Sequence, residues 1–265
     1  MKKHHFCSFC SKALINNHVL ELIPCFRLKD RKKYWKFYQT VDELCSELYS
    51  SGATIRRDLA ALESNRLIHR THGGAVFIDG TANDFPLTLR ESKNMLLKER
   101  IAAKALPLIH DGMTLFMDSS STVNAVAERL NGFRNLRVVT NGIKTCNILS
   151  EKEGVEVYCT GGKLRENAKS LTGAAALRSI GGFYADLTLF SCRGVMPNGG
   201  FSDTNEDEAE LKRAYMRNSD KVILLCDSTK LGKKYFCKIG ELQELWQLLT
   251  DIDLPAEYGT FPNEG

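Results

Sequence analysis

Apolar residues recur at helical spacing in two neighbouring stretches around residue 50. In the first stretch the apolar positions are Val41, Leu44 and Leu48. In the second stretch they are Ile55, Leu59 and Leu62, at positions i, i+4 and i+7. At 3.6 residues per turn each set lies on one face of a helix, and that face must be buried. The pattern therefore predicts two short amphipathic helices in succession.

Capping signals mark where both helices begin. Thr40-Val-Asp-Glu43 has the form of a capping box, in which Thr40 caps the helix and Glu43 reaches back to it. Ser51 is placed to cap the second helix. The two helices would be joined by the turn Tyr49-Ser50-Ser51. This order is typical of a helix-turn-helix unit, whose second helix enters the major groove of DNA.

The exposed side of the second helix is basic. At about 100° per residue, Arg57 points away from the apolar face, and Thr54 and Arg56 lie on its flanks. A short helix with this arrangement suits a recognition helix, although an Arg-Arg pair is equally compatible with a face that is only solvated. Downstream, Leu67 to Ile78 alternates around Gly73-Gly74, which predicts a tight hairpin that would form a wing. The expected DNA contacts are Ser51, Thr54, Arg56, Arg57, Arg70, His72, Gly73 and Gly74.

After residue 93 the pattern changes to alternating strands and helices. Residues 79–93 lack periodicity, contain Gly80 and Pro86, and predict a linker. A helix is expected over about 94–110. Short apolar runs then occur at 114–117, 136–140, 155–159, 187–192, 222–226 and 245–249, and helical patterns at 122–130, 143–150 and 207–218. Strands that alternate with helices predict a mostly parallel sheet covered on both faces.

The expected fold class is therefore α/β, with two domains and a linker. A small winged helix-turn-helix domain would occupy 1–78, with 1–39 irregular, and a Rossmann-like, mostly parallel α/β domain would occupy 94–265. Residues 1–80 hold 13 Lys and Arg against 8 Asp and Glu, a net charge of +5, whereas the remainder holds 23 against 24, a net charge of −1. The basic excess thus coincides with the predicted recognition helix, as phosphate binding requires.

The first 40 residues carry weaker signals. Cys7-Ser-Phe-Cys10 has the spacing of a zinc-ligand pair, but no second such pair completes the four ligands of a structural site. The basic and aromatic run from Arg27 to Tyr38 is compatible with nucleic-acid contact, but we favour a helix that packs its aromatic rings inward. We expect no metal ion and no cofactor. Since no apolar run approaches the ~20 residues of a membrane helix and no secretory signal is evident, we expect a cytoplasmic protein.

Polar residues follow several of the predicted strands, at the sheet edge where open α/β folds bind ligands. In Asp118-Ser-Ser-Ser-Thr122, hydroxyl groups at a helix start favour an anion site, since a simple helix cap needs only one of them. Thr140-Asn-Gly142 and Thr160-Gly-Gly-Lys163 follow the next two strands, and Lys230 follows a later one. Glu208 and Lys212 lie at i and i+4, so they predict either a surface salt bridge or a charged part of the same site.

These motifs resemble those of a known family. TIRRDLAALE followed by RLIHRTHGGA resembles the signature of the DeoR family of bacterial transcriptional repressors, and DGMTLFMDSSSTV, VVTNGI, TGGKL, EAELKR and CDSTK resemble its effector-binding domain. The likeness covers about residues 40–254. At Tyr49-Ser50-Ser51 the chain departs from the family, whose members usually have a small residue, often Gly, then a hydrophobic residue and Ser.

The resemblance implies a sensor domain related in fold to ribose-5-phosphate isomerase and glucosamine-6-phosphate deaminase. It further implies a phosphorylated sugar as effector and double-stranded operator DNA as partner, and we expect a homodimer or a larger homo-oligomer. The implied effector contacts are Asp118, Ser119, Ser120, Ser121, Thr122, Asn141, Gly161, Gly162, Asp203, Glu208, Lys212 and Lys230. One alternative is an isomerase or deaminase in which Glu208 or Asp203 moves a proton. Another is a sensor that has lost DNA binding. The recognition helix and wing favour a regulator that is not an enzyme.

Overall fold

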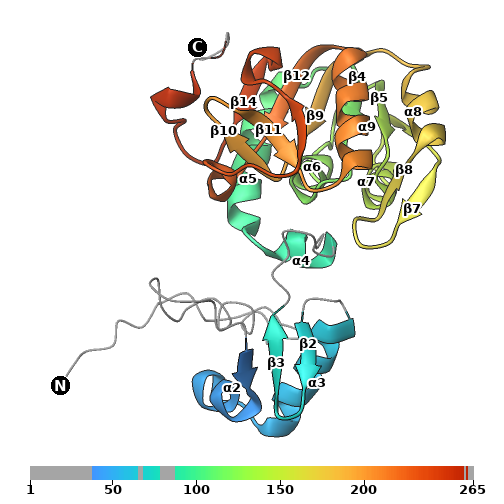
Figure 1. The fold of residues 1–265 in the computed structure, drawn as a ribbon. Coiled ribbons are helices and arrows are strands. Elements are labelled where there is room, and N and C mark those ends of the chain that lie inside the picture. Colours follow the sequence, from blue (N-terminus) through green and yellow to red (C-terminus); the bar gives the residue numbers. More distant parts are fainter. Residues whose placement is uncertain (1–37, 65–67, 78–86, 260, 262–265) are drawn as a thin grey trace. The chain divides into compact units, whose positions relative to one another are not determined.

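The computed structural model describes residues 38–64, 68–77, 87–259 and 261, and the chain divides into two compact units, 1–83 and 84–265 (Figure 1). The N-terminal unit contains β1 (Tyr38–Thr40), α2 (Val41–Leu48), α3 (Gly52–Ser64), β2 (Ile68–Thr71) and β3 (Gly74–Phe77). The expectations for Cys7 and Cys10 and for most of Arg27–Tyr38 lie outside the described residues.

The two predicted helices of the N-terminal unit are α2 and α3. The capping box is present as predicted, because the Thr40 hydroxyl accepts from the Glu43 amide and the Glu43 carboxylate accepts from the Thr40 amide. Between the helices, Tyr49 adopts a left-handed conformation at φ 50° and ψ 38°. Tyr49 thereby takes the left-handed conformation that glycine most often adopts at the end of a helix, and the helix-turn-helix forms despite the departure from the motif that the sequence resembles.

The predicted hairpin is also present, with a small difference at its turn. β2 and β3 pair antiparallel with Thr71 opposite Gly74, so the two turn residues are His72 and Gly73, and Gly73 has φ +86°. Gly74 already belongs to β3, where it also lies opposite Thr40 of β1. The third strand β1 is not predicted by the sequence pattern, because three residues are too few to show alternation.

The second unit is built on a six-stranded parallel sheet with the strand order β14-β12-β9-β4-β5-β6. Its strands are β4 (Thr114–Met117), β5 (Leu136–Thr140), β6 (Val155–Cys159), β9 (Ala185–Phe190), β12 (Ser219–Leu225) and β14 (Gln247–Leu249). Its helices are α4 (Leu87–Ser92), α5 (Met95–Ala105), α6 (Ser121–Ala127), α7 (Ile143–Ser150), α8 (Ala174–Ile180) and α9 (Glu206–Arg217). The predicted parallel α/β architecture is therefore confirmed.

Alternate residues of β4 divide the core between the two faces of the sheet. Leu115 and Met117 of β4 pack with α5, α6 and α7 on one face, whereas Phe116 packs with α8 and α9 on the other. Phe190 of β9 joins a third apolar cluster beneath a small antiparallel sheet, which is formed by β10 (Gly194–Met196), β11 (Gly200–Asp203) and β13 (Cys237–Gly240). Both faces are thus covered, as a parallel sheet requires.

The structure differs from the predicted pattern in its small elements. Leu87–Ser92, expected within the linker, forms α4, whose Leu87 is buried and donates from its backbone to the Asn167 carbonyl at 2.8 Å. The hairpin of β7 (Lys163–Arg165) and β8 (Ser170–Thr172) and the helix α8 are absent from the prediction. The helix expected over 94–110 ends at Ala105, where a 3-10 helix over Leu106–Leu108 begins. Within the described residues, no helix is both long and apolar enough to span a membrane.

Candidate functional site

The exposed face of α3 carries the first group of predicted site residues. Ser51 caps the helix, since its hydroxyl accepts from the Thr54 amide at 3.2 Å and lies 2.9 Å from the Thr54 hydroxyl. Arg56 and Arg57 are exposed, whereas Ile55, Leu59 and Leu62 are buried on the opposite side. The predicted division between an apolar and a basic face is therefore confirmed.

The wing carries the second group of these residues. Arg70 is anchored to the end of α3, because its amide donates to Glu63 Oε1 at 2.8 Å and its guanidinium lies 4.0 Å from Glu63 Oε2. His72 and Gly73 are exposed at the turn, whereas Gly74 is buried between β1 and β2. Arg70, His72 and Gly73 are thus accessible, and Gly74 shapes the hairpin from inside.

The second unit holds a polar site where the order of the strands reverses. The chain runs from β4 outward through β5 to β6, and then returns to β9 on the other side of β4. At the carboxyl ends of β4 and β9, the Asp118 carboxylate accepts from the Ser120 amide at 2.9 Å and from the Ser191 amide at 3.1 Å. This topological switch point is the position at which open α/β sheets bind ligands.

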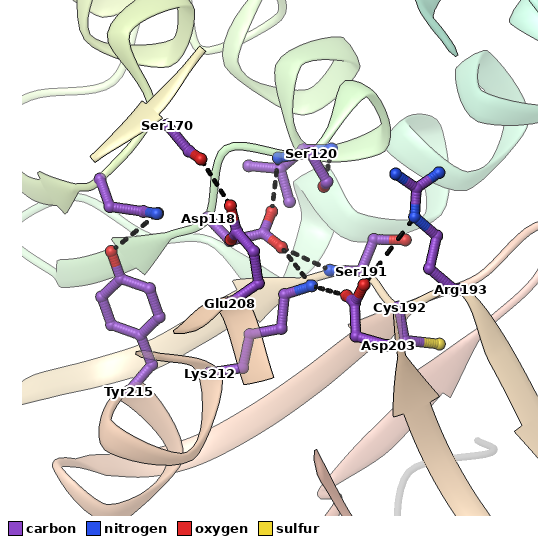
Figure 2. Close-up of polar contacts among 12 residues, drawn as sticks. Asp118, Ser120, Ser170, Ser191, Cys192, Arg193, Asp203, Glu208, Lys212 and Tyr215 are labelled. Carbon is purple, nitrogen blue, oxygen red and sulfur yellow. Dashed lines mark hydrogen bonds and ion pairs between the residues drawn. The ribbon is translucent and has the colours of Figure 1, made fainter. Parts of the chain in front are cut away.

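Lys212 of α9 lies at the centre of this site (Figure 2). Its ammonium bonds to Asp203 Oδ2 and lies 3.8 Å from Asp118 Oδ2, and all three side chains are buried. Burial alone would lower the pKa of Lys212, but the carboxylates of Asp203 and Asp118 outweigh it and raise the pKa. The site therefore contains an ammonium that the two neighbouring carboxylates hold in its charged form.

Asp203 is held in its charged form by cations on two sides. Burial alone would raise its pKa, but Lys212 and Arg193, whose Nε lies 3.8 Å from Asp203 Oδ1, lower the pKa below the ordinary value. The Thr204 amide also donates to Asp203 Oδ1 at 2.8 Å. A carboxylate in this setting accepts hydrogen bonds well and takes up a proton poorly.

Glu208 lies one turn before Lys212 on α9 but has other partners (Figure 2). Its Oε1 accepts from Arg165 at 2.7 Å and from the Ser170 hydroxyl, both of which belong to the β7–β8 hairpin. The predicted alternative of a surface salt bridge between Glu208 and Lys212 is wrong, because both are buried and each pairs with residues of other elements.

Two further predicted residues lie next to this network. The Tyr215 hydroxyl of α9 donates to Asn141 Oδ1 at 3.2 Å, and Asn141 Nδ2 donates to the Leu171 carbonyl at 3.2 Å. Lys230 Nζ donates to the Ser191 hydroxyl at 2.8 Å and lies 3.6 Å from Asp227 Oδ2. The Ser191 amide donates to Asp118, so Ser191 bonds to Lys230 through its hydroxyl and to the centre of the site through its backbone.

The remaining predicted residues lie around this cluster or further along the sheet edge. Ser120 caps α6 by accepting from the Val123 amide at 3.2 Å, while Ser119 and Ser121 are buried beside it. Thr122 is fully buried, and its hydroxyl has no hydrogen-bond partner in the described part of the chain. Gly161 and Gly162 are exposed after β6, two strands away from β4, with φ of +61° and +120°.

Sequence reasoning misses several polar residues of the site. These are Arg165, Ser170, Ser191, Arg193 and Tyr215. Ser191 and Arg193 follow the buried strand β9, so the rule that selected Asp118 could have found them. Arg165 and Ser170 come from a hairpin of two three-residue strands, which leaves no periodic signal. No group of three or more His, Cys, Asp or Glu that could hold a metal ion occurs among the residues described.

Comparisons with known proteins agree with this architecture. A family model described as DeoR-like helix-turn-helix domain matches residues 36–81, and one described as DeoR C terminal sensor domain matches residues 93–252. The HTH-type transcriptional regulator YulB of Bacillus subtilis, itself uncharacterized, is 37% identical over 81% of this chain and 83% of its own length. The glycerol-3-phosphate regulon repressor of Escherichia coli is 34% identical over 83% of this chain and 86% of its own length.

The solved structures with a similar fold are more distant. Ribose-5-phosphate isomerase A from Methanocaldococcus jannaschii is 15% identical, with a TM-score of 0.40, over 52% of this chain and 55% of that chain. This likeness is too weak to bear on activity. The family models together cover both units, and the relatives match most of the chain. The chain therefore belongs to the DeoR family of helix-turn-helix transcriptional regulators.

Proposed function

We propose that this protein represses a sugar-catabolism operon and that a phosphorylated sugar changes its affinity for the operator. The observation that carries the proposal is the presence, in one chain, of an exposed basic recognition helix and a buried polar site at the switch point of an α/β sheet. The first feature suits operator DNA, and the second suits a small polar ligand. Such a regulator acts in the cytoplasm, where the DNA lies.

The DNA contacts follow from the exposed residues of the N-terminal unit. In our proposal Arg57 contacts base edges from α3, with Thr54, Arg56 and Ser51 beside it, because the N-terminal part of a recognition helix enters the major groove. Arg70, His72 and Gly73 contact the sugar-phosphate backbone or the minor groove from the wing. Gly74 contributes by fixing the shape of the hairpin.

The effector contacts follow from the charges at the switch point. Lys230 is the cation for the phosphate, since its side chain is partly exposed and, within the described part of the chain, its one ion pair is with Asp227 at 3.6 Å. The carboxylates of Asp118, Asp203 and Glu208 accept from sugar hydroxyls, while Lys212 offsets their charge. The other proposed contacts are Ser119, Ser120, Ser121, Thr122, Asn141, Gly161 and Gly162.

Oligomerisation and the absence of catalysis complete the proposal. A homodimer or larger assembly presents two recognition helices, and their spacing matches the half-sites of an operator.

The site is poorly suited to isomerisation, because a general base works best with a pKa near the operating pH. Asp203 has a lowered pKa, and Glu208 is engaged by Arg165 and Ser170. We therefore infer that the site binds its ligand without turning it over.

Operator titrations test the DNA part of the proposal. The full chain is titrated onto the DNA upstream of its own gene, at moderate salt and with unrelated competitor DNA. Arg57→Ala should weaken specific binding about 5- to 150-fold, because a base contact contributes about 1–3 kcal/mol. The matched control is Arg100→Ala, since Arg100 is an exposed arginine on α5 of the other unit. Equal binding by Arg57→Ala and wild type would refute the assigned recognition face.

A ligand panel tests the effector part of the proposal. Glycerol 3-phosphate and hexose and pentose phosphates are added to the operator complex, each beside its unphosphorylated parent compound. One phosphorylated compound should shift the operator affinity about 5- to 150-fold, which corresponds to a coupling of about 1–3 kcal/mol. Lys230→Met should abolish the shift. An operator affinity that no phosphorylated sugar changes would contradict the proposed effector class.

A further inference from the structure

Lys98 is a buried lysine that neither candidate site uses. It lies in the first turns of α5, is 5% exposed, and donates to the Lys93 carbonyl at 2.6 Å and to the Arg90 carbonyl. Arg90 belongs to the last turn of α4, and backbone carbonyls at the end of a helix commonly bond to groups outside it. The Lys98 ammonium therefore completes the C-terminal end of α4 and fastens that helix to α5.

The helix that carries Lys98 begins beside the loop that carries Lys230. Asn94, at the start of α5, donates to Asp227 Oδ1 at 3.4 Å and to the Thr229 hydroxyl at 3.2 Å, so α5 begins against this loop. Burial and the positive charge of Lys230 lower the pKa of Lys98 to about 8, and Asp227 acts in the opposite direction. The charge of Lys98 is thus sensitive to the electrostatic potential at the proposed phosphate site.

The other two charged groups that act on Lys98 belong to α4. One of them, Glu91, is also joined to the polar site through hydrogen bonds. Arg90 lowers the pKa of Lys98 and Glu91 raises it. Glu91 accepts from Asn124 of α6 at 3.1 Å and from Lys144 of α7 at 2.7 Å. Asn124 accepts in turn from the Thr145 hydroxyl, which lies 3.3 Å from the Asp118 carbonyl.

We propose that Lys98 is a positioning residue that fastens α4 to the rest of the sensor unit, residues 84–265, and that an anion bound beside Lys230 tightens this attachment. An anion there offsets the charge of Lys230, which favours the ammonium form of Lys98, and a charged donor bonds to the α4 carbonyls more strongly than a neutral one. Because α4 is the first described element of residues 84–265, covalent connection to the N-terminal unit passes through it. Only the identity of the anion rests on the proposed function.

Hydrogen exchange of the full chain at about pH 8 tests the attachment. Lys98→Met should speed exchange of the 87–93 amides about tenfold or more, because hydrogen bonds from a charged donor are lost. The matched control is Lys104→Met, since Lys104 lies on the same helix but donates to the Thr250 carbonyl at 2.8 Å. Lys98→Arg keeps the charge and should stay close to wild type. Unchanged exchange of 87–93 in Lys98→Met, with the β4 and α6 amides still protected, would overturn the proposal.

A second measurement tests whether the attachment responds to charge. Lys230→Met removes the opposing cation, so exchange of the 87–93 amides should slow severalfold in the wild-type background and stay unchanged in the Lys98→Met background. Inorganic phosphate and glycerol 3-phosphate should act as Lys230→Met does. Equal effects of Lys230→Met in both backgrounds, or none in either, would overturn the charge response. If these variants behave as expected but no phosphorylated sugar alters operator binding, the proposed function fails while the inference stands.

Discussion

Lys212→Met removes the positive charge from between two buried carboxylates and keeps the side chain at similar length. The Lys212 side chain is 7% exposed, and those of Asp203 and Asp118 are 7% and 2% exposed. After the substitution, both carboxylates stay buried and have lost the ammonium as a partner. The stability effect of the variant therefore measures the desolvation of two charges more than a change in packing volume.

The expected loss is large. Breaking a buried ion pair by removing one partner costs about 3–5 kcal/mol, because the other charge stays buried. For a unit of this size each kcal/mol corresponds to about 2–4 °C, so the sensor unit should melt roughly 6–20 °C lower. The difference in melting temperature should narrow as the pH falls, because Lys212 no longer lowers the pKa of Asp203 in the variant, and this buried carboxylate can then take up a proton.

Scanning calorimetry of the full chain checks this magnitude. The matched control is Lys238→Met, since Lys238 also bonds to a carboxylate, Glu241, but the two side chains are 54% and 49% exposed. A surface pair of this kind contributes less than about 1 kcal/mol, so the control should stay within about 4 °C of wild type. If Lys212→Met melts no lower than Lys238→Met, the Asp118–Lys212–Asp203 cluster is not the desolvated ion pair described above.

Three further substitutions have expected outcomes that unfolding experiments can check. Asp203→Asn should make the free energy of unfolding depend less on pH in the acid range. The lowered pKa of Asp203 contributes stability that is present above the unfolded-state pKa of about 3.9 and is lost as the pH falls through the folded-state pKa. A pH dependence equal to that of wild type would contradict this. Tyr49→Gly should stabilise the N-terminal unit by about 1 kcal/mol. A left-handed conformation costs a non-glycine residue roughly 1–2 kcal/mol, and the greater flexibility of glycine in the unfolded chain offsets part of the gain. A less stable N-terminal unit in the variant would refute this prediction. Gly162→Ala should destabilise the sensor unit by about 1–3 kcal/mol, because residue 162 has φ +120° and a Cβ there would lie 2.6 Å from the Thr172 carbonyl oxygen. Gly161→Ala should cost less, because a Cβ at residue 161 would have no atom within 4 Å.

The parallel sheet, and the edge of the sheet at which the polar site lies, could be predicted from the sequence. A strand that is buried on both faces appears in the sequence as a continuous apolar run. The run at 114–117 gave β4 with the same bounds, and a polar loop directly after such a run could be placed at the ligand-binding edge. Helix spacing then showed which residues of α3 face the core and which face solvent. These signals are local, so a single sequence contains them.

The partners of the site residues could not be predicted, because they depend on elements that are short and distant in sequence. Glu208 and Lys212 form a plausible pair when only α9 is considered. In the fold, Arg165 of β7 approaches Glu208, and Asp203 at the end of β11 approaches Lys212. Strands β7, with the sequence KLR, and β11, with the sequence GFSD, are too short to show a period and lack the continuous apolar run that indicated β4. The sequence pattern therefore did not indicate that they exist.

The reversal of strand order at Asp118 also governs when the sensor site can form. Asp118 ends the first strand of the sheet, while Ser191 ends a strand that the ribosome makes only after β5 and β6 are complete. Lys212 and Lys230 are synthesised later still. Domains generally fold in order from the N-terminus during synthesis, and contacts between distant residues form slowly. A growing chain therefore completes its helix-turn-helix unit first and the proposed ligand site last, so a prematurely terminated product would contain the helix-turn-helix unit without that site.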